Sequence, residues 1–312
     1  MNFRNTRITQ LLKIKYPILE GGMAWAGTSI LAAAVSNAGG LGTIGSGSMD
    51  RQLLTQEIKK IKTMTDKPFA VNIMLLNPYA QELVETVIEE KVPCVVFGAG
   101  NPAKFLPLLK ENNVISMAVV SSENLAVRLE RAGIDAIIGE GMESGGHIGD
   151  VTTMVLIPKL MDCLSVPLVA AGGIADGRAM AACFALGAQG VQMGTRFLAS
   201  KECQVHEEYK NKIIKAGIRD TVITGEKLGH SARVIRTKFA KRVCELELDC
   251  PDQAEEMLVG SLKRAVVNGD VEEGAFMAGQ CIGLIEQVES VKDIIEKTVF
   301  HAEKIFCGGQ EV

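Results

Sequence analysis

Two glycine-rich stretches have the composition of a phosphate-binding site. They read AGGIADG at residues 171–177 and GVQMGTRF at residues 190–197, and each accompanies a short apolar run typical of a strand. Glycines allow backbone N–H groups to approach phosphate oxygens, and the start of a following helix favours negative charge. The alternative is that these glycines only close tight turns.

A histidine lies in a third glycine-rich stretch, GGHIG at residues 145–149. Glycine neighbours leave the ring of His147 accessible to a ligand, and an imidazole is suited to proton transfer near neutral pH. A structural histidine is the alternative. The other three histidines, His206, His230 and His301, lack such surroundings and are interpreted as structural.

Two polar residues follow or interrupt apolar runs. The amide of Asn72 could donate to and accept from a planar heteroaromatic ring. Glu140 ends a buried run, where a carboxylate needs a partner such as a ribityl hydroxyl or a cation. The alternatives are an asparagine satisfied within the core and a glutamate solvated at the rim.

The chemistry that this set supports is cofactor chemistry. The chain has no Ser-His-Asp order, no cluster of metal ligands and no Walker sequence, so we expect no metal site. A phosphate cradle, apolar walls and one proton-transfer group are what a protein needs when the cofactor itself reacts. Flavin mononucleotide (FMN) fits these features.

The elements that must position these residues alternate regularly between strands and helices. Strand-like runs occur at residues 16–22, 41–44, 69–73, 94–97, 114–120, 135–139, 166–170 and 190–193. Runs with helical spacing separate them, and the period of roughly 25 residues shows no break. Eight such units predict an α/β fold, the (β/α)8 TIM barrel, in which active sites form at the carboxyl ends of the strands.

The alternation stops after residue 200. We therefore predict a barrel core at residues 1–200, a helical insertion or lid at 201–260, and a C-terminal segment at 261–312 that returns to the barrel. The insertion carries a basic stretch from Arg233 to Arg242.

The sequence GLGTIG at residues 40–45 matches the G-x-G-x-x-G pattern of dinucleotide-binding folds. That pattern requires a strand before the glycines and a helix after them. Here the preceding segment is helical and the glycines flank a strand, so we interpret them as structural.

Composition excludes some classes of partner. The 312 residues carry a formal net charge of -4, with 47% hydrophobic and 22% charged residues, which is ordinary for a globular protein. Nucleic-acid binding is not expected without a basic surface. The eight cysteines are scattered and indicate reduced thiols, and no apolar run has the length of a signal or membrane segment. We expect a cytoplasmic protein that does not bind membranes.

Several motifs together resemble one enzyme family. They are PILEGGMAW at 17–25, AVSNAGGLG at 34–42, KPFAVNIM at 67–74, EGMESGGHIG at 140–149, AGGIADG at 171–177, GTRF at 194–197, GDV at 269–271 and MAGQ at 277–280. The set resembles the FMN-dependent enoyl-acyl-carrier-protein reductase II family of bacteria and covers nearly the whole chain. Nitronate monooxygenases share the barrel, the flavin and the Gly-Gly-His loop, but tend to have Gln and Arg where this chain has Glu140 and Ile148.

The resemblance implies reduction of a trans-2-enoyl thioester on acyl carrier protein in fatty-acid synthesis, with NADH or NADPH as the source of hydride and FMN as its carrier. It makes His147 the catalytic histidine, as proton donor or as polariser of the thioester carbonyl. A homodimer is expected. The residues that the resemblance assigns to FMN are Gly22, Met23, Asn72, Glu140, Gly145, Gly172, Gly173, Gly194 and Thr195.

Two alternatives accompany this interpretation: a nitronate monooxygenase that uses FMN and O2, and a flavin- or phosphate-binding module without catalysis. We also hypothesise that the basic stretch Arg233 to Arg242 meets the acidic carrier protein, because opposite charges steer association. A solvated helix face is the other interpretation of this stretch.

Overall fold

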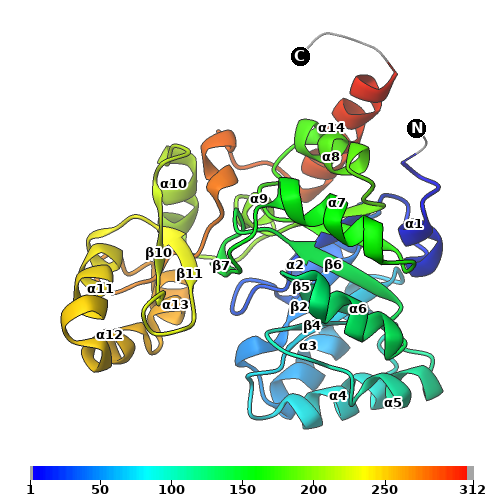
Figure 1. Cartoon of the computed structure of the whole chain (residues 1–312), viewed down its shortest axis with the longest axis horizontal. Helices are drawn as coiled ribbons and strands as arrows, with labels where there is room; N and C mark the ends of the chain where they lie inside the picture. The colour runs from blue at the N-terminus through cyan, green and yellow to red at the C-terminus, as the bar shows by residue number, and fades with distance from the viewer. Residues whose placement is uncertain (1–2, 308–312) are drawn as a thin grey trace.

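The computed structural model describes residues 3–307, so residues 1–2 and 308–312 of the predicted segments lie outside the described range. Eight parallel strands form one sheet in the order β1-β9-β8-β6-β5-β4-β3-β2. The predicted TIM barrel is confirmed (Figure 1). The strands are β1 (Ile18–Glu20), β2 (Gly42–Gly45), β3 (Phe69–Met74), β4 (Cys94–Gly98), β5 (Ile115–Val120), β6 (Ala136–Glu140), β8 (Leu168–Ala171) and β9 (Gly190–Met193).

The backbone pairing that closes the barrel between β1 and β2 is short. Leu19 and Leu41 form a single parallel bridge. Beyond it, the carboxylate of Glu20 accepts a hydrogen bond from the N–H of Thr43 at 3.0 Å. A buried side chain thus continues the ladder where backbone pairing ends, and its burial raises the pKa of Glu20 well above the usual value.

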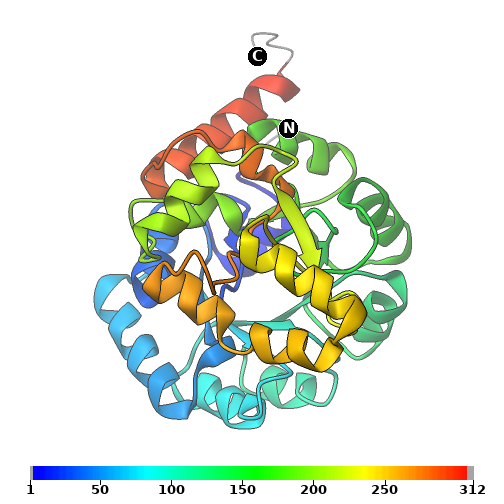
Figure 2. The ribbon, with the colours of Figure 1, turned by 90° about the vertical axis from the view of Figure 1, so that its left-hand side faces the viewer.

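Helices surround the strands and follow them in the predicted order. Viewed along the barrel, they form a ring (Figure 2). They are α1 (Arg7–Leu12), α2 (Ser29–Asn37), α3 (Arg51–Met64), α4 (Ala80–Glu89), α5 (Leu106–Glu111), α6 (Glu123–Arg131), α7 (Thr153–Cys163), α8 (Gly177–Ala185), α9 (Thr195–Leu198) and α14 (Val291–Phe306), with a 3₁₀ turn η1 (Ser46–Ser48) after β2. Helix α14 packs against α8 and α2. It thereby covers the part of the ring that α9, with only four residues, is too short to cover.

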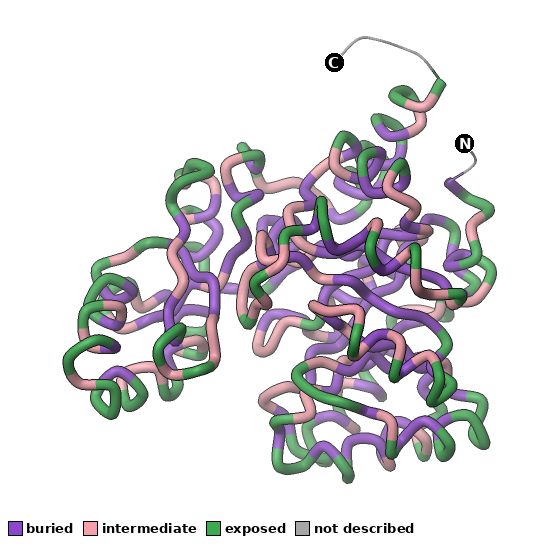
Figure 3. The backbone as a smooth tube through the Cα atoms, in the orientation of Figure 1, coloured by how far each residue is buried: buried purple, intermediate pink, exposed green. Residues whose placement is uncertain are grey.

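Two apolar layers stabilise the barrel. Inside the barrel, strand residues such as Leu19, Met117 and Ile138 pack with Ile8 and Leu12 of α1. Helix α1 thus closes the amino end of the barrel. A larger layer lies between the strands and the helices, and buried backbone runs through the centre of the molecule in Figure 3. The open end of the barrel is therefore its carboxyl end.

The glycines of the GLGTIG stretch have a packing role, as the sequence predicted. Gly40 precedes β2, Gly42 begins it, and Gly45 ends it ahead of the short 3₁₀ turn η1, so these glycines do not open an α-helix. A Cβ on Gly42 would lie 1.8 Å from the carbonyl oxygen of Ala32, so α2 approaches β2 too closely for any side chain.

The segment after Ser200 contains helices and a hairpin. Its elements are α10 (Glu207–Lys215), β10 (Thr221–Thr224), β11 (Ala232–Ile235), α11 (Lys238–Asp249), α12 (Pro251–Leu258), α13 (Ser261–Lys263) and the π-helix η2 (Arg264–Asn268), followed by the 3₁₀ turn η3 (Gln280–Leu284). The sequence predicted the helices but not the two strands. They form a three-stranded antiparallel sheet with β7 (Gly146–His147), a partner from the barrel loops that lies 74 or more residues earlier in the chain. We call the segment 201–268 the insertion; it lies across the carboxyl end of the barrel (Figure 2).

Candidate active site

A cavity of about 280 Å³ lies at the carboxyl ends of the barrel strands, beneath the insertion. The structure brings all ten residues that the sequence singled out to its wall. They are Gly22, Met23, Asn72, Glu140, Gly145, His147, Gly172, Gly173, Gly194 and Thr195.

The glycine-rich turns form one end of the cavity. Gly172 and Gly173 follow β8 with φ angles of 94° and 78°, a left-handed conformation that favours glycine. Gly194 precedes α9, and the hydroxyl of Thr195 accepts a hydrogen bond from the N–H of Gly279 at 2.9 Å. The adjacent Arg196 is buried and paired with Glu289, so an anion here would meet backbone N–H groups rather than this guanidinium.

A second glycine contact sets the position of Asn72. A Cβ on Gly22 would lie 2.2 Å from Cγ of Asn72, so only glycine allows the amide to occupy this place. Nδ2 of Asn72 donates to the carbonyl oxygen of Val96 at 3.2 Å. The strand thus holds part of the amide while the side chain still lines the cavity.

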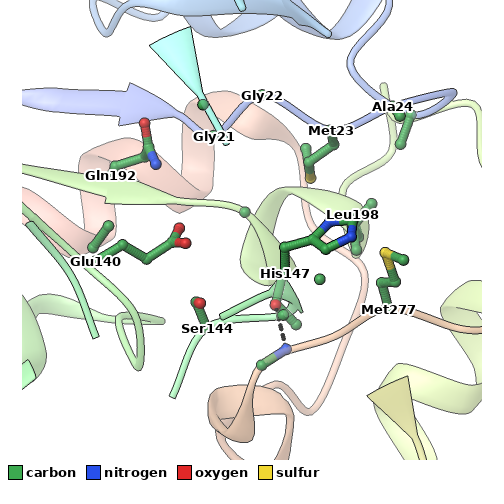
Figure 4. A pocket seen from close by; sticks show the side chains of 18 of the residues that line it. Gly21, Gly22, Met23, Ala24, Glu140, Ser144, His147, Gln192, Leu198 and Met277 are labelled. Atoms are coloured by element: carbon green, nitrogen blue, oxygen red, sulfur yellow. Dashed lines mark hydrogen bonds between the residues drawn. The ribbon is translucent and has the colours of Figure 1, made fainter. Parts of the chain in front are cut away.

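Unpaired buried polar groups face this cavity. Gln192, on β9, and Ser144 are 6% and 8% exposed, and Gln192 Oε1 and Ser144 Oγ have no hydrogen-bond partner among the described residues. Both lie with Glu140 on one side of the cavity (Figure 4). Buried polar atoms without partners are uncommon, and here they are what a polar ligand would satisfy.

Glu140 titrates in an unusual range. Burial raises the pKa of its carboxyl to about 7, and the neighbouring Ser144 hydroxyl counters part of this increase. The hydroxyl nevertheless has no hydrogen-bond partner within residues 3–307, and burial is the dominant cause. A carboxyl at the end of β6 can therefore be neutral or charged near physiological pH.

His147 is accessible from the cavity. Its ring points between Met23, Leu198 and Met277 and makes no hydrogen bond with any described residue (Figure 4). Partial burial, and secondarily the charge of the nearby His230, lower the pKa of His147 from the ordinary 6.5. The imidazole is therefore neutral at pH 7 and has a free N–H to donate.

Comparison with protein families identifies the group to which this chain belongs. The family model described as nitronate monooxygenase matches residues 5–300. The chain belongs to the nitronate monooxygenase family. Curated members that resemble it include a probable nitronate monooxygenase of Staphylococcus aureus strain MSSA476, which is 35% identical over 89% of this chain and 92% of its own length.

Solved structures of higher identity also match. FabK from Thermotoga maritima is 60% identical, covers 97% of this chain and 98% of its own, and superimposes with a TM-score of 0.97. A nitroalkane oxidase from Streptomyces ansochromogenes is 26% identical over 96% of this chain and 99% of its own, with a TM-score of 0.84. Within the nitronate monooxygenase family, this chain is therefore much more similar to FabK than to that oxidase.

Some residues of the site that the sequence did not indicate come from outside the barrel strands and the loops that follow them. The insertion and the C-terminal segment contribute Tyr209, Leu262, Val266, Met277 and Cys281, whose approach to the cavity depends on tertiary packing. Gln192 could have been found, because it is a polar residue in an apolar strand two positions before Gly194.

Neither a metal centre nor a membrane segment is found in residues 3–307. No group of three or more His, Cys, Asp or Glu side chains there could hold a metal ion. Within the same range, no helix has both the length and the apolar character needed to span a bilayer.

Proposed function

We propose that this chain is an FMN-dependent enoyl-acyl-carrier-protein reductase that uses NADH or NADPH. The observation that carries the proposal is the 60% identity with FabK over 97% of the chain, against 35% with the probable nitronate monooxygenase. The difference is large for chains of one family, and the motifs around Glu140 and Ile148 favour the same choice.

The residues at the cavity fit a flavin mononucleotide. The turns at Gly172, Gly173 and Gly194 would hold its phosphate through backbone N–H groups, with Thr195 at the start of α9. The unpaired Gln192 and Ser144 would satisfy polar atoms of the flavin ring or its ribityl chain, as would Asn72 and Glu140. When bound, FMN would supply the hydride for the β-carbon of the enoyl thioester.

His147 would act on the carbonyl of the thioester. Because its pKa is lowered, the ring is neutral at pH 7 and donates an N–H hydrogen bond instead of carrying a positive charge. A donor aimed at this oxygen stabilises the enolate charge that develops as the β-carbon is reduced. The lowered pKa thus favours the role of carbonyl polariser over that of imidazolium acid.

The apolar part of the cavity suits an acyl chain. Met23, Leu198 and Met277 surround the ring of His147, and Leu262 and Val266 add apolar surface from the insertion (Figure 4). Such walls exclude water from the reacting carbons, which strengthens every electrostatic interaction there.

The proposed partner is acyl carrier protein, but the basic stretch requires a correction. Arg233 is only 4% exposed and donates hydrogen bonds inside the protein, so it is unable to dock a partner. Arg242 is paired with Glu273 and Arg236 donates to two backbone carbonyls. The docking hypothesis is left with the exposed Lys238, and with Lys241, whose ammonium is itself paired with the carboxylate of Glu245 at 3.7 Å. A homodimer and a cytoplasmic location remain predictions.

A nitronate monooxygenase is the second candidate, because that is the activity named by the family model and by the curated relatives. It would use the same cavity and the same flavin, with His147 acting on a nitronate. The two candidates differ in what reduces the flavin.

A His147→Ala variant tests the proposed role. We expect it to retain bound flavin and to be reduced by NADH at the rate of the native protein. Turnover of crotonyl thioester to butyryl thioester, followed by mass spectrometry, should fall by about 10²–10³-fold, the range typical of a lost oxyanion donor. Turnover within twofold of the native rate would exclude this role.

In the native protein, turnover should decline as the pH falls through the pKa of His147; an increase at low pH would indicate an imidazolium acid instead.

A further inference from the structure

The insertion is hydrogen-bonded to the loop that carries His147. Strand β11 pairs with β7, so that Ala232 lies opposite His147 and Arg233 lies opposite Gly146. Figure 1 shows β7 beside β11, apart from the eight strands of the barrel. The catalytic loop, residues 141–149, is a barrel loop that also supplies the third strand, Gly146–His147, of the insertion's sheet.

Arg233 adds side-chain contacts to the same loop. Its Nε and Nη2 donate to the carbonyl oxygen of Met142 at 3.1 and 2.9 Å, and its Nη1 donates to Oγ1 of Thr221 at 3.2 Å. The guanidinium is buried, and burial lowers its pKa while Glu143 counters this effect. One buried side chain therefore joins strand β10, strand β11 and the start of the catalytic loop.

The opposite side of the catalytic loop packs tightly against the C-terminal segment. A Cβ on Gly145 would lie 2.5 Å from the carbonyl carbon of Ala278, and the N–H of Gln280 donates to the carbonyl oxygen of Glu143 at 2.9 Å. The loop is clamped between the C-terminal segment and the insertion. A change in the contact at Met142 would consequently change the position of His147, five residues later, within the cavity.

We propose that Arg233 is a positioning residue that fixes the catalytic loop and thereby the imidazole of His147. The insertion then determines the geometry of the active site in addition to covering it. This inference rests on the proposed function, since it takes His147 as the residue that acts on the thioester.

Arg236 provides a control in the same segment of the insertion. It lies three residues along the chain, after β11, and donates to the backbone carbonyls of Arg219 and Thr221 at 3.4 and 3.2 Å. Its hydrogen bonds thus support the insertion without reaching residues 141–149. Arg233 is buried whereas Arg236 is exposed, so the position of the loosened backbone, and not the size of the loss alone, distinguishes a positioning role from general support of the insertion.

The test compares Arg233→Met with Arg236→Met in flavin-loaded protein under anaerobic conditions. The readouts are flavin reduction by NADH, flavin reoxidation by crotonyl-CoA per bound flavin, and backbone hydrogen–deuterium exchange. For Arg233→Met we expect reduction within twofold of native, reoxidation at least tenfold slower, and the largest increase in exchange at residues 141–149. Arg236→Met should match the native protein in all three readouts.

Reoxidation of Arg233→Met within twofold of native, or equal losses in both variants, would overturn the proposal. If Arg233→Met fails to retain flavin, Arg233→Lys is tested in its place. The lysine ammonium keeps the charge but loses the paired hydrogen bonds to Met142, so reoxidation should still be several-fold slower. A native rate of reoxidation in Arg233→Lys would overturn the proposal. Native protein that crotonyl-CoA does not reoxidise would refute the proposed function instead, and exchange at residues 141–149 would then decide the role of Arg233.

Discussion

At the scale of residues, the sequence indicated which residues line the cavity but not which groups each of them contacts. The ten candidate residues lie near or after the carboxyl ends of strands, and a barrel brings such positions together whatever their roles. Arg233 shows what the sequence does not reveal. In the sequence it is one of several basic residues, and only the tertiary structure shows that its side chain points inward and donates to the carbonyl oxygen of Met142. Ser144 was missed for the same reason, since a serine between loop residues carries no periodic signal.

Glu140 gives a pH-dependent prediction at this scale. Its pKa is about 7 in the folded protein against 4.5 ordinarily, so the folded state binds the proton more tightly than the unfolded state. The stability of the flavin-free protein should therefore fall as the pH rises from 4.5 to 7, by up to about 3 kcal/mol from this group.

Chemical denaturation of native protein and Glu140→Gln at several pH values measures this effect. The difference in unfolding free energy between the two proteins isolates Glu140 from other groups, such as Glu20, whose pKa is also raised. We expect the native protein to lose stability relative to the variant between pH 5 and pH 8. A constant difference over this interval would show that Glu140 titrates in its ordinary range.

At the scale of elements, apolar runs were enough to predict the eight barrel strands, because each strand is buried on both faces and reads as a continuous hydrophobic segment. The hairpin β10–β11 has four residues in each strand and lies among charged residues. Its third strand, β7, has only two residues and comes from a distant loop. Pairing of this kind is specified by tertiary contacts, so local patterns did not predict it.

The glycine turns after β8 and β9 give a prediction for flavin retention. Gly173 and Gly133 both have left-handed backbones, with φ angles of 78° and 92°. An alanine at either position should cost about 1–2 kcal/mol of stability. Gly173 lines the cavity, whereas a Cβ on Gly133 would meet no atom within 4 Å.

Titration of flavin-free Gly173→Ala and Gly133→Ala with FMN separates the two effects. We expect the FMN dissociation constant to rise at least tenfold for Gly173→Ala and to stay within twofold of native for Gly133→Ala. Equal affinity in both variants would mean that the turn after β8 does not hold the phosphate.

At the scale of the whole molecule, the insertion is joined to the barrel on more than one side. Its sheet includes His147, and at the other side the ammonium of Lys263 lies 4.9 Å from the ring centre of Trp25 in the loop after β1. Trp25 itself has a left-handed backbone, with φ of 65°, which is rare for a bulky residue and is retained where surrounding contacts enforce it. The barrel supplies the cradle, while the insertion and the C-terminal segment complete the cavity.

The central claim is that this member of the nitronate monooxygenase family reduces enoyl thioesters. Anaerobic stopped-flow absorbance of the native flavin-loaded protein tests it most directly, by mixing first with NADH or NADPH and then with crotonyl thioester. We expect that a nicotinamide bleaches the flavin and that the thioester restores its colour, while an alkyl nitronate does not bleach it. Bleaching by the nitronate but by neither nicotinamide would exclude the enoyl reductase and identify a nitronate monooxygenase.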